Sequence, residues 1–300
     1  MLEIVDAAAA KHDAMPVHGP DDSQTGSGWD ATAAAWERNR ARMWGATHAV
    51  GEGLVDMAAP RPGEVVLELA AGAGDTGLLA LDRIGPEGRL TLSDSSGGML
   101  DAAGRNAARH GGGRMPGNVE LRRVDAEAIG MPDGSVDVVL CRWGYMLMDD
   151  PAAALAETRR ILRRPGGRVA LAVWASRDRN PWNTVAGDPL SERGLVPLTP
   201  PDEPGMYRLA DPAELEQLLR AAGFTPVELR ELPVSWRFRD LDEQWAVMAE
   251  ISPSLHAVLE QLGAEELASL RADVAARCEP YRSGDGYELP GVSIGALASG

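Results

Sequence analysis

The sequence predicts an α/β fold with a doubly wound, mostly parallel sheet of seven strands, and three observations lead to this prediction. Short apolar runs alternate with amphipathic segments from residue 65 to residue 174. The first apolar run leads into a glycine-rich turn, which is typical of the passage from a strand to a helix in such folds. Helical periodicity lies outside this alternation as well, before residue 60 and again after residue 240, and predicts N-terminal helices and a helical insert before the last strand.

The predicted strands are short and nearly continuous in apolar residues, as expected for parallel strands that helices cover on both faces. The segments VVLELA at residues 65–70 and VDVVLCRW at residues 136–143 are the clearest examples. The other strands are predicted over residues 89–94, 119–125, 167–174, 225–238 and 285–300.

Helices are predicted between and beside these strands. Asp150 and Asp211 each precede a proline, a pair that suits the N-cap and the first turn of a helix. Amphipathic spacing predicts one or two helices from residue 29 to about residue 58, and another over residues 99–110.

Towards the end of the chain, two more amphipathic helices are predicted, over residues 252–263 and 264–278. Residues 175–210 are rich in proline and polar groups, and we expect them to form a loop over the active site. The chain is thus predicted to contain a flexible arm (1–28), an N-terminal helical cap (29–60), a cofactor-binding core (61–239), a helical substrate-cap insert (240–284) and a final core strand (285–300).

The charge of the chain limits its partners. The net charge is −16, and arginine supplies nearly all the positive charge because Lys11 is the only lysine. An acidic surface without a separate basic patch repels phosphate backbones. We therefore expect a small-molecule substrate and no nucleic acid.

The sequence also indicates a compartment and a redox class. No apolar run approaches the roughly 20 residues that span a bilayer, and the acidic N-terminus lacks the basic start of a signal peptide. We therefore expect a cytoplasmic protein without a membrane partner. Cys141 and Cys278 are too few for a disulfide framework or a metal site, and we expect both to be buried. The oligomeric state stays open, and a homodimer is compatible with the sequence.

The most informative segment is the glycine-rich turn after the first strand. Gly72, Gly74 and Gly77 fit the GxGxxG pattern of nucleotide sites. Glycines let the backbone turn tightly and approach a ligand beside the N-terminus of a helix. This pattern alone is a weak indicator, because several nucleotide cofactors use it.

Two cofactor classes compete for this turn. A dehydrogenase would place a diphosphate at the helix N-terminus, where the carboxylate of Glu68 is unhelpful. S-adenosylmethionine carries an ammonium and a sulfonium group and no phosphate, so a carboxylate at the strand end suits it. Glu68 therefore favours the sulfonium cofactor.

Three carboxylates end three successive predicted strands: Glu68, Asp94 and Asp125. Asp94 can accept hydrogen bonds from both ribose hydroxyls, and Asp125, followed by Ala126, can meet the adenine. In open α/β folds, ligands bind in the crevice at the carboxyl ends of the strands. The three residues thus predict one nucleoside site at that edge.

With these residues in place, the chain resembles the class I S-adenosylmethionine-dependent methyltransferases, in the ubiquinone/menaquinone-biosynthesis-like branch (methyltransferase type 11). The resemblance covers about residues 64–175 and follows the family's order and spacing. Its matching stretches are VVLELAAGAGDTG, LTLSDSSGGMLDAA, NVELRRVDAEAIGMPDGSVDVVLCRWG and LRRPGGRVALAVW.

The resemblance implies a Rossmann-like methyltransferase fold with S-adenosylmethionine as cofactor, S-adenosylhomocysteine as product and no metal. Ala70 stands where the family usually has its first glycine, which puts the affinity for the cofactor in question. The implied cofactor-binding residues are Glu68, Ala70, Gly72 and Gly74 at the methionine part, Asp94, Ser95 and Met99 at ribose and adenine, Asp125, Ala126 and Glu127 at the adenine rim, and Arg142, through its backbone carbonyl, near the methionine amino group.

Substrate contacts are expected from the cap and from the segment after the fourth strand. Eight tryptophans against two phenylalanines are an unusual balance, and tryptophan offers a large flat surface with one donor. The substrate candidates are Trp36, Trp143, Tyr145, Met146 and Trp182, although Trp36 suits a packing role as well.

Methyl transfer needs alignment and exclusion of water more than it needs a dedicated base. If a base acts, His256 and Tyr145 are the candidates by residue type. The sequence thus predicts methylation at O, N or C of a small molecule. The alternatives are an NAD(P)-dependent reductase or epimerase, and a protein that binds S-adenosylmethionine without catalysis.

Overall fold

The computed structural model describes residues 27–300, so most of the predicted arm over residues 1–28 lies outside the described residues. Residues 27 and 28, the last two of the predicted arm, already belong to helix α1 (Ser27–Ala58). Some side chains within the helices, that of His256 among them, also lie outside the description.

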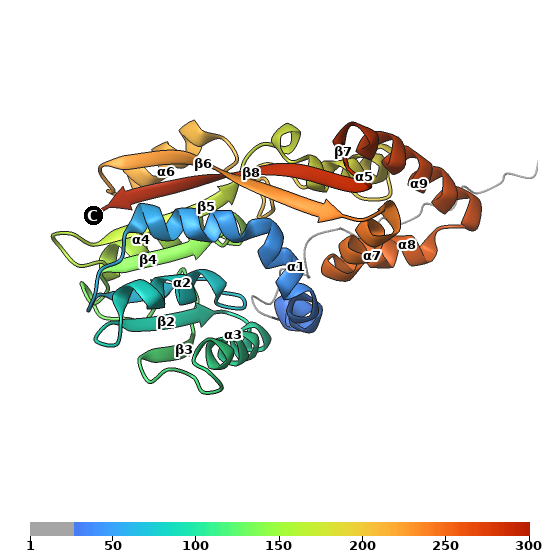
Figure 1. The fold of residues 1–300 in the computed structure, drawn as a ribbon. Coiled ribbons are helices and arrows are strands. Elements are labelled where there is room, and N and C mark those ends of the chain that lie inside the picture. Colours follow the sequence, from blue (N-terminus) through green and yellow to red (C-terminus); the bar gives the residue numbers. More distant parts are fainter. Residues whose placement is uncertain (1–26) are drawn as a thin grey trace, which may run out of the picture.

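A single sheet organises the described part of the chain, in the order β3-β2-β1-β4-β5-β8-β6 (Figure 1). The first five strands are mutually parallel, while β8 runs antiparallel to both β5 and β6. The strands are β1 (Val65–Glu68), β2 (Arg89–Asp94), β3 (Val119–Arg123), β4 (Val138–Arg142), β5 (Arg168–Trp174), β6 (Val227–Phe238), β7 (Arg282–Ser283) and β8 (Gly286–Ser299). The predicted α/β class is confirmed, and the two-residue β7, which pairs with β8, brings the sheet to eight strands instead of seven.

Helices cover both faces of the sheet. α1, α2 and α3 lie on one face, and α4 and α6 lie on the other (Figure 1). The helices after α1 are α2 (Asp75–Ile84), α3 (Gly97–His110), α4 (Pro151–Ile161), α5 (Pro181–Glu192), α6 (Pro212–Ala221), α7 (Leu241–Ile251), α8 (Pro253–Gln261) and α9 (Ala264–Cys278). Between them the central strands β1, β2, β4 and β5 are mostly buried, and Val66, Val138 and Val139 are fully inaccessible.

Capping residues begin two of these helices where the sequence predicts them. The Asp150 carboxylate accepts hydrogen bonds from the amides of Ala152 and Ala153 at the start of α4. The Asp211 carboxylate accepts one from Ala213 at the start of α6. Both are N-caps with proline in the first turn.

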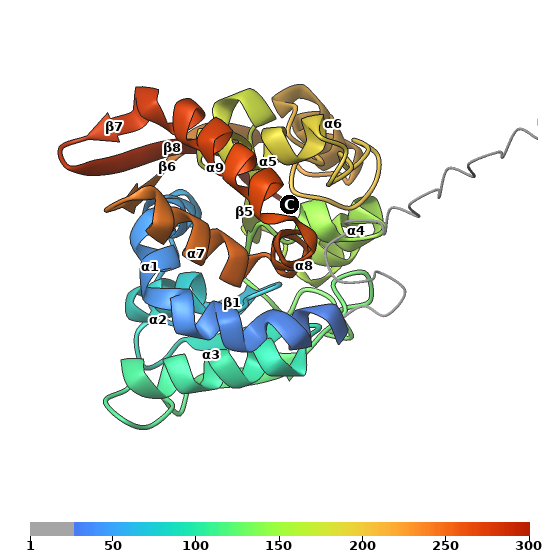
Figure 2. The same cartoon turned by 90° about the vertical axis from the view of Figure 1, so that its right-hand side faces the viewer.

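The long strands β6 and β8 extend beyond the carboxyl edge of the parallel strands and lead to a group of helices there (Figure 1). These are α5, α7, α8 and α9, called the cap below. They face the N-terminal half of α1, which lies between α3 and α7 (Figure 2). The cap therefore stands over the strand ends at which ligands bind in open α/β folds.

Two elements of the cap differ from the prediction. Residues 175–210 are not a plain loop, because they contain α5, which begins at Pro181 and includes Pro189. An interior proline removes one helical hydrogen bond and usually indicates a break, and this misled the prediction. The insert after β6 holds three helices rather than two, because α7 precedes the two predicted ones.

None of the described helices has the length and hydropathy required to cross a membrane. Cys141 and Cys278 are free and buried, as predicted.

Candidate functional site

The carboxyl ends of the parallel strands bring together the residues that the sequence predicts as a nucleoside site. Glu68 ends β1, Asp94 ends β2 and Arg142 ends β4. Asp125 follows β3 after Val124, and an isolated bridge to Ala128 shapes its turn. β2, β1 and β4 are direct neighbours in the sheet, so these groups share one edge.

The turn after β1 is built from left-handed backbone. Ala70, Gly72 and Gly74 have φ values of 49°, 54° and 76°. At Gly74 a side chain would also meet Leu92 Cδ1 at 2.8 Å, so this position requires glycine on two grounds. Ala70 adopts the same left-handed conformation although it carries a methyl side chain. The alanine that stands in place of the family's usual first glycine therefore still forms the turn.

Glu68 fixes this turn to the helix that follows it. Its carboxylate is buried and accepts a hydrogen bond of 2.8 Å from the amide of Gly77, in the first turn of α2. A Cβ atom on Gly77 would lie 2.5 Å from Glu68 Oε2, which explains the glycine there. Burial raises the pKa of Glu68 to about 8.

Asp94 joins the turn to the next strand end. One carboxylate oxygen accepts from the amide of Gly72 at 2.9 Å, and the other from the amide of Ser96 at 3.0 Å. Burial raises the pKa of Asp94, while the backbone amides of Ser96, Gly72 and Ser95 oppose the shift. Ser95 is half-buried, and the amide of Met99 donates to the Ser96 hydroxyl at the N-cap of α3.

The predicted adenine rim is more open. Asp125 is exposed and accepts a hydrogen bond from the amide of Glu127 at 2.9 Å. Ala126 is half-buried between them. The Glu127 carboxylate in turn accepts from the amide of Asp150 at 3.0 Å, which ties the rim to the start of α4.

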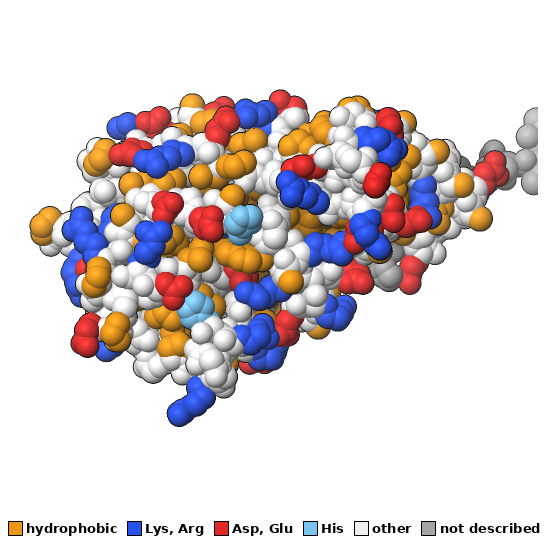
Figure 3. Space-filling model, in the orientation of Figure 1, with side chains coloured by type: hydrophobic (Ala, Val, Ile, Leu, Met, Phe, Trp, Pro, Cys, Tyr) orange, Lys and Arg blue, Asp and Glu red, His pale blue; other side chains and the backbone are white. Residues whose placement is uncertain are grey.

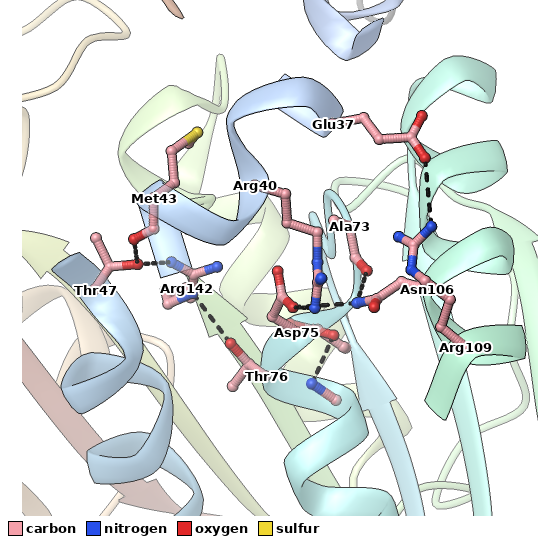
Figure 4. Close-up of polar contacts among 12 residues, drawn as sticks. Glu37, Arg40, Met43, Thr47, Ala73, Asp75, Thr76, Asn106, Arg109 and Arg142 are labelled. Atoms are coloured by element: carbon pink, nitrogen blue, oxygen red, sulfur yellow. Dashed lines mark hydrogen bonds and ion pairs between the residues drawn. The ribbon is translucent and has the colours of Figure 1, made fainter. Parts of the chain in front are cut away.

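Helix α1 closes over this edge through polar contacts that the sequence did not reveal. Arg40 forms an ion pair with Asp75, and Asn106 donates to the same carboxylate at 3.1 Å (Figure 4). One turn earlier, Glu37 pairs with Arg105 of α3 at 2.7 Å. Asp75 lies inside the glycine-rich motif, but its partner on α1 is 35 residues away, so only the fold shows their pairing.

The Asp30 carboxylate, near the start of α1, accepts from the amide of Gly98 at 2.9 Å and from the Ser96 hydroxyl. Together, Asp30, Glu37 and Arg40 dock the first half of α1 on α2 and α3. We call these three residues the α1 latch.

The tryptophan after the fourth strand, Trp143, forms a stack with tryptophans from distant elements. Trp143 lies parallel to Trp174 of β5, with 4.2 Å between the ring centroids. The stack continues through Trp182 of α5 at 5.0 Å to Trp236 of β6 at 5.3 Å. The indole of Trp143 also donates to Ser293 of β8 at 2.9 Å. Trp143 and Trp182 thus belong to one aromatic wall between core and cap.

The remaining substrate and base candidates differ in their placement. Tyr145 is buried, its hydroxyl is 2.6 Å from that of Thr158 in α4, and burial raises its pKa, so the structure does not favour it as a base. Met146 is buried beside it. Trp36 packs edge-to-face on Trp29 at 5.7 Å. His256 lies on α8, with its side chain outside the described residues.

Several buried polar atoms of α1 and the cap-facing elements have no hydrogen-bond partner among the described residues. They are the indole nitrogens of Trp36 and Trp236, the Nε of Arg40, and both amide atoms of Gln244 in α7. Gln244 is 1 % exposed, so water does not satisfy it at the surface. Such groups are costly unless a ligand or water meets them.

Comparison with known proteins addresses the family. Residues 66–167 match a family model described as a methyltransferase domain. The chain is 33% identical over 181 residues to the ubiquinone/menaquinone biosynthesis C-methyltransferase UbiE of Cupriavidus taiwanensis, covering 55% of this chain and 72% of that protein. The chain belongs to the class I S-adenosylmethionine-dependent methyltransferases. The resemblance found in the sequence is thereby confirmed, and the reductase or epimerase alternative is not favoured.

Other relatives agree in part. The UbiE of Hahella chejuensis is 35% identical over 141 residues, which are 47% of this methyltransferase and 55% of that protein, so the chain spans about half the length of this relative. Among solved structures, the YcgJ protein from Bacillus subtilis gives a TM-score of 0.52 at 19% identity and covers 84% of this chain and 97% of that one.

A second solved structure is Haemonchus contortus phosphoethanolamine N-methyltransferase 2 with phosphomonomethylethanolamine and S-adenosylhomocysteine. It gives a TM-score of 0.52 at 16% identity and covers 90% of this chain and 57% of that one. At these identities the two structures support the fold alone. Within the described residues no group of three His, Cys, Asp or Glu could hold a metal ion.

Proposed function

We propose that this methyltransferase binds S-adenosylmethionine at the edge formed by Glu68, Asp94 and Asp125, and methylates O, N or C of a small, flat, partly apolar molecule. The observation that carries the proposal is the geometry of Asp94. Its two carboxylate oxygens accept from the amides of Gly72 and Ser96, and the amide of Ser95 acts on the same group. A carboxylate offers about four acceptor positions, so Asp94 can still accept a hydrogen bond from the ribose.

The other cofactor contacts are proposed from their places around Asp94. The left-handed turn at Ala70, Gly72 and Gly74 would lie along the methionine part, with Glu68 holding the turn in position from behind. Asp125 and Ala126 would meet the adenine, with Glu127 as a link to α4. Ser95 and Met99 would complete the wall beside the ribose and adenine.

In the reaction, S-adenosylmethionine supplies a methyl group already activated by its sulfonium leaving group. The protein's part is to align the acceptor with that methyl group and to exclude water. The α1 latch performs the exclusion on one side, because it joins α1 to the N-terminal ends of α2 and α3. A base is required only for acceptors that lose a proton as they react.

The acceptor is proposed to lie between the strand ends and the cap. The aromatic wall from Trp143 to Trp236 offers flat apolar surface, and Gln244 and Trp36 offer polar atoms without partners among the described residues. A planar molecule with a few oxygen or nitrogen atoms would use both features. The name of the UbiE relatives adds support for carbon as the methylated atom.

We further propose that the protein acts in the cytoplasm without a nucleic acid partner. The net charge of −16 supports this. On the face drawn in Figure 3, basic side chains are interspersed with acidic ones, so no extended basic patch is visible there.

Calorimetric titration with S-adenosylhomocysteine tests the cofactor site. We expect micromolar or tighter binding, and a loss of about 1–3 kcal/mol in Asp94→Ala because the ribose hydrogen bonds disappear. The control is Glu87→Ala, an exposed carboxylate just before the amino end of β2, at the opposite edge of the sheet, which should bind like the wild type. Unchanged affinity in Asp94→Ala would remove Asp94 from the site, and binding of NAD in place of S-adenosylhomocysteine would refute the cofactor class.

A further inference from the structure

Arg142 carries a positive charge into the centre of the proposed site. It ends β4 and is held by two threonines from different helices (Figure 4). Its Nε donates to Thr76 Oγ1 of α2 at 3.1 Å, and its Nη1 donates to Thr47 Oγ1 of α1 at 3.3 Å. Both acceptors are neutral, so they fix the guanidinium group without neutralising it.

Two indole rings complete this fixation. The guanidinium carbon lies 4.6 Å from the ring centroid of Trp143 and 5.6 Å from that of Trp44. Trp143 has a φ of 63°, a conformation that a bulky residue rarely adopts. Such strain persists only where the surroundings impose it, and it concentrates at functional sites. The backbone is therefore bent at the residue that holds the guanidinium in place.

The nearby carboxylates are already engaged. Asp75 is paired with Arg40, and the Glu68 carboxylate accepts from the amide of Gly77. Most arginines of the described chain form an ion pair with a carboxylate, but Arg142 has no carboxylate at ion-pair distance among the described residues. Burial lowers its pKa, yet an arginine stays protonated in proteins.

An unpaired guanidinium group in a half-buried position is costly to the folded state. It has five N–H donors, of which the threonines use two. The remaining N–H groups suit a planar anion with two oxygens such as a carboxylate, because paired guanidinium N–H donors match the spacing of the two carboxylate oxygens.

We infer that the guanidinium group of Arg142 binds a carboxylate in the methyl-transfer site, through the N–H groups that Thr47 and Thr76 leave free. This inference rests on the proposed function and gives Arg142 a side-chain role in place of the backbone contact implied by the resemblance. The carboxylate has two sources, the methionine part of the cofactor or an acidic acceptor. The chemistry is the same for both, and binding experiments separate them.

The first experiment compares wild type, Arg142→Met and Arg142→Lys by calorimetry. The probes are S-adenosylhomocysteine and 5′-methylthioadenosine, which lacks the amino-acid part. If the cofactor supplies the carboxylate, Arg142→Met binds S-adenosylhomocysteine about tenfold or more weakly, with 5′-methylthioadenosine unchanged within about twofold. Arg142→Lys keeps the positive charge but loses the paired N–H donors of the guanidinium group. Its affinity for S-adenosylhomocysteine should therefore lie between those of the wild type and Arg142→Met.

The second experiment uses 2-naphthoate and its uncharged counterpart 2-naphthamide, with S-adenosylhomocysteine at saturation. If the acceptor supplies the carboxylate, wild type prefers the naphthoate, and Arg142→Met loses that preference by about tenfold or more while binding S-adenosylhomocysteine normally. Unchanged binding of both carboxylates in Arg142→Met overturns the inference.

A measurement on the wild type alone guards against unfolded variants. S-adenosylhomocysteine is compared with its carboxamide, and 2-naphthoate with 2-naphthamide. A preference for the charged member of either pair supports the inference, and absence of preference in both overturns it. If S-adenosylhomocysteine itself fails to bind the wild type, the proposed function fails, which is a different result.

Discussion

The two sides of the site differ in how their buried polar groups are satisfied. On the cofactor side, Glu68 and Asp94 accept hydrogen bonds from backbone amides of the turn that they support. On the proposed acceptor side, the amide of Gln244 and the indole nitrogens of Trp36 and Trp236 have no partner among the described residues. The cofactor side is thus preorganised by the chain itself, whereas the acceptor side holds polar groups that a ligand can still satisfy.

The two sides also differ in what holds them together. The cofactor side is part of the sheet and its inaccessible core, with Val66 and Leu92 fully buried. The cap helices are joined to their neighbours by ion pairs with partly exposed arginines, such as Arg42–Glu243 and Arg193–Asp273. Exposed ion pairs contribute little to stability. The aromatic wall is thus one of the buried apolar attachments between the cap and the core.

Removal of a ring from the middle of that wall should have the largest effect. Trp174 is 6 % exposed and contacts both Trp143 and Trp182. We expect Trp174→Ala to lower the free energy of unfolding by about 3–5 kcal/mol, because it leaves a cavity between core and cap. Denaturant unfolding measures this, with Leu198→Ala as a control because Leu198 is 57 % exposed. Equal stability of the two variants would show that the wall does not hold the cap.

The pH dependence of stability probes the cofactor side. The pKa of Glu68 is raised to about 8, so the folded state keeps a proton that the unfolded state releases near pH 4.5. The stabilisation by this proton is complete below pH 4.5 and is lost as the pH rises through about 8. We expect this loss to reach about 1.4 kcal/mol per pH unit at most.

Glu68→Gln should flatten this dependence, because glutamine still accepts from Gly77 and does not ionise. The measurement is urea unfolding of wild type and variant from pH 5 to pH 8. Glu87→Gln, at an exposed position, serves as the control and should follow the wild type. Parallel curves for Glu68→Gln and wild type would contradict the buried, protonated state of Glu68.

The smallest expected effect is an increase in stability, opposite in sign to the loss expected for Trp174→Ala. Gln244→Leu removes two buried polar atoms that lack partners, and we expect the free energy of unfolding to rise by about 1 kcal/mol. Gln217→Leu, at an exposed position of α6, should change it by less than about 0.5 kcal/mol. A loss of stability in Gln244→Leu, seen by thermal denaturation, would mean that the amide is already satisfied and that the contrast between the two sides is wrong.

The same contrast explains what the sequence could predict. The core strands, the caps Asp150 and Asp211, and the strand-end carboxylates follow from local patterns, because each lies within a few residues of the strand or helix that it serves. The aromatic wall joins Trp143, just after β4, with residues of β5, α5 and β6. No local pattern connects them, so only Trp143 and Trp182 were predicted, each on its own.

The ion pair between Arg40 and Asp75 could not be predicted for the same reason, because no local pattern connects the two residues. Arg40 looks like an exposed helix residue, and Asp75 looks like part of a turn, until α1 is placed over α2. Helix α5 was missed for a different reason, since Pro189 is compatible with a helix when only one hydrogen bond is lost. What stays beyond sequence reasoning is contact between elements that are distant in the chain.

The position of helix α1 has a consequence for how the binding of the two proposed ligands is coupled. Its first half contacts α3 through Asp30 and Glu37, and on its other side Asn39 donates to Glu250 of α7 at 2.6 Å. The same helix therefore borders both of the proposed ligand compartments. If a ligand in one compartment orders this helix, it also affects binding in the other, and thermodynamic reciprocity then requires the nucleoside and the acceptor to change each other's affinity by the same factor.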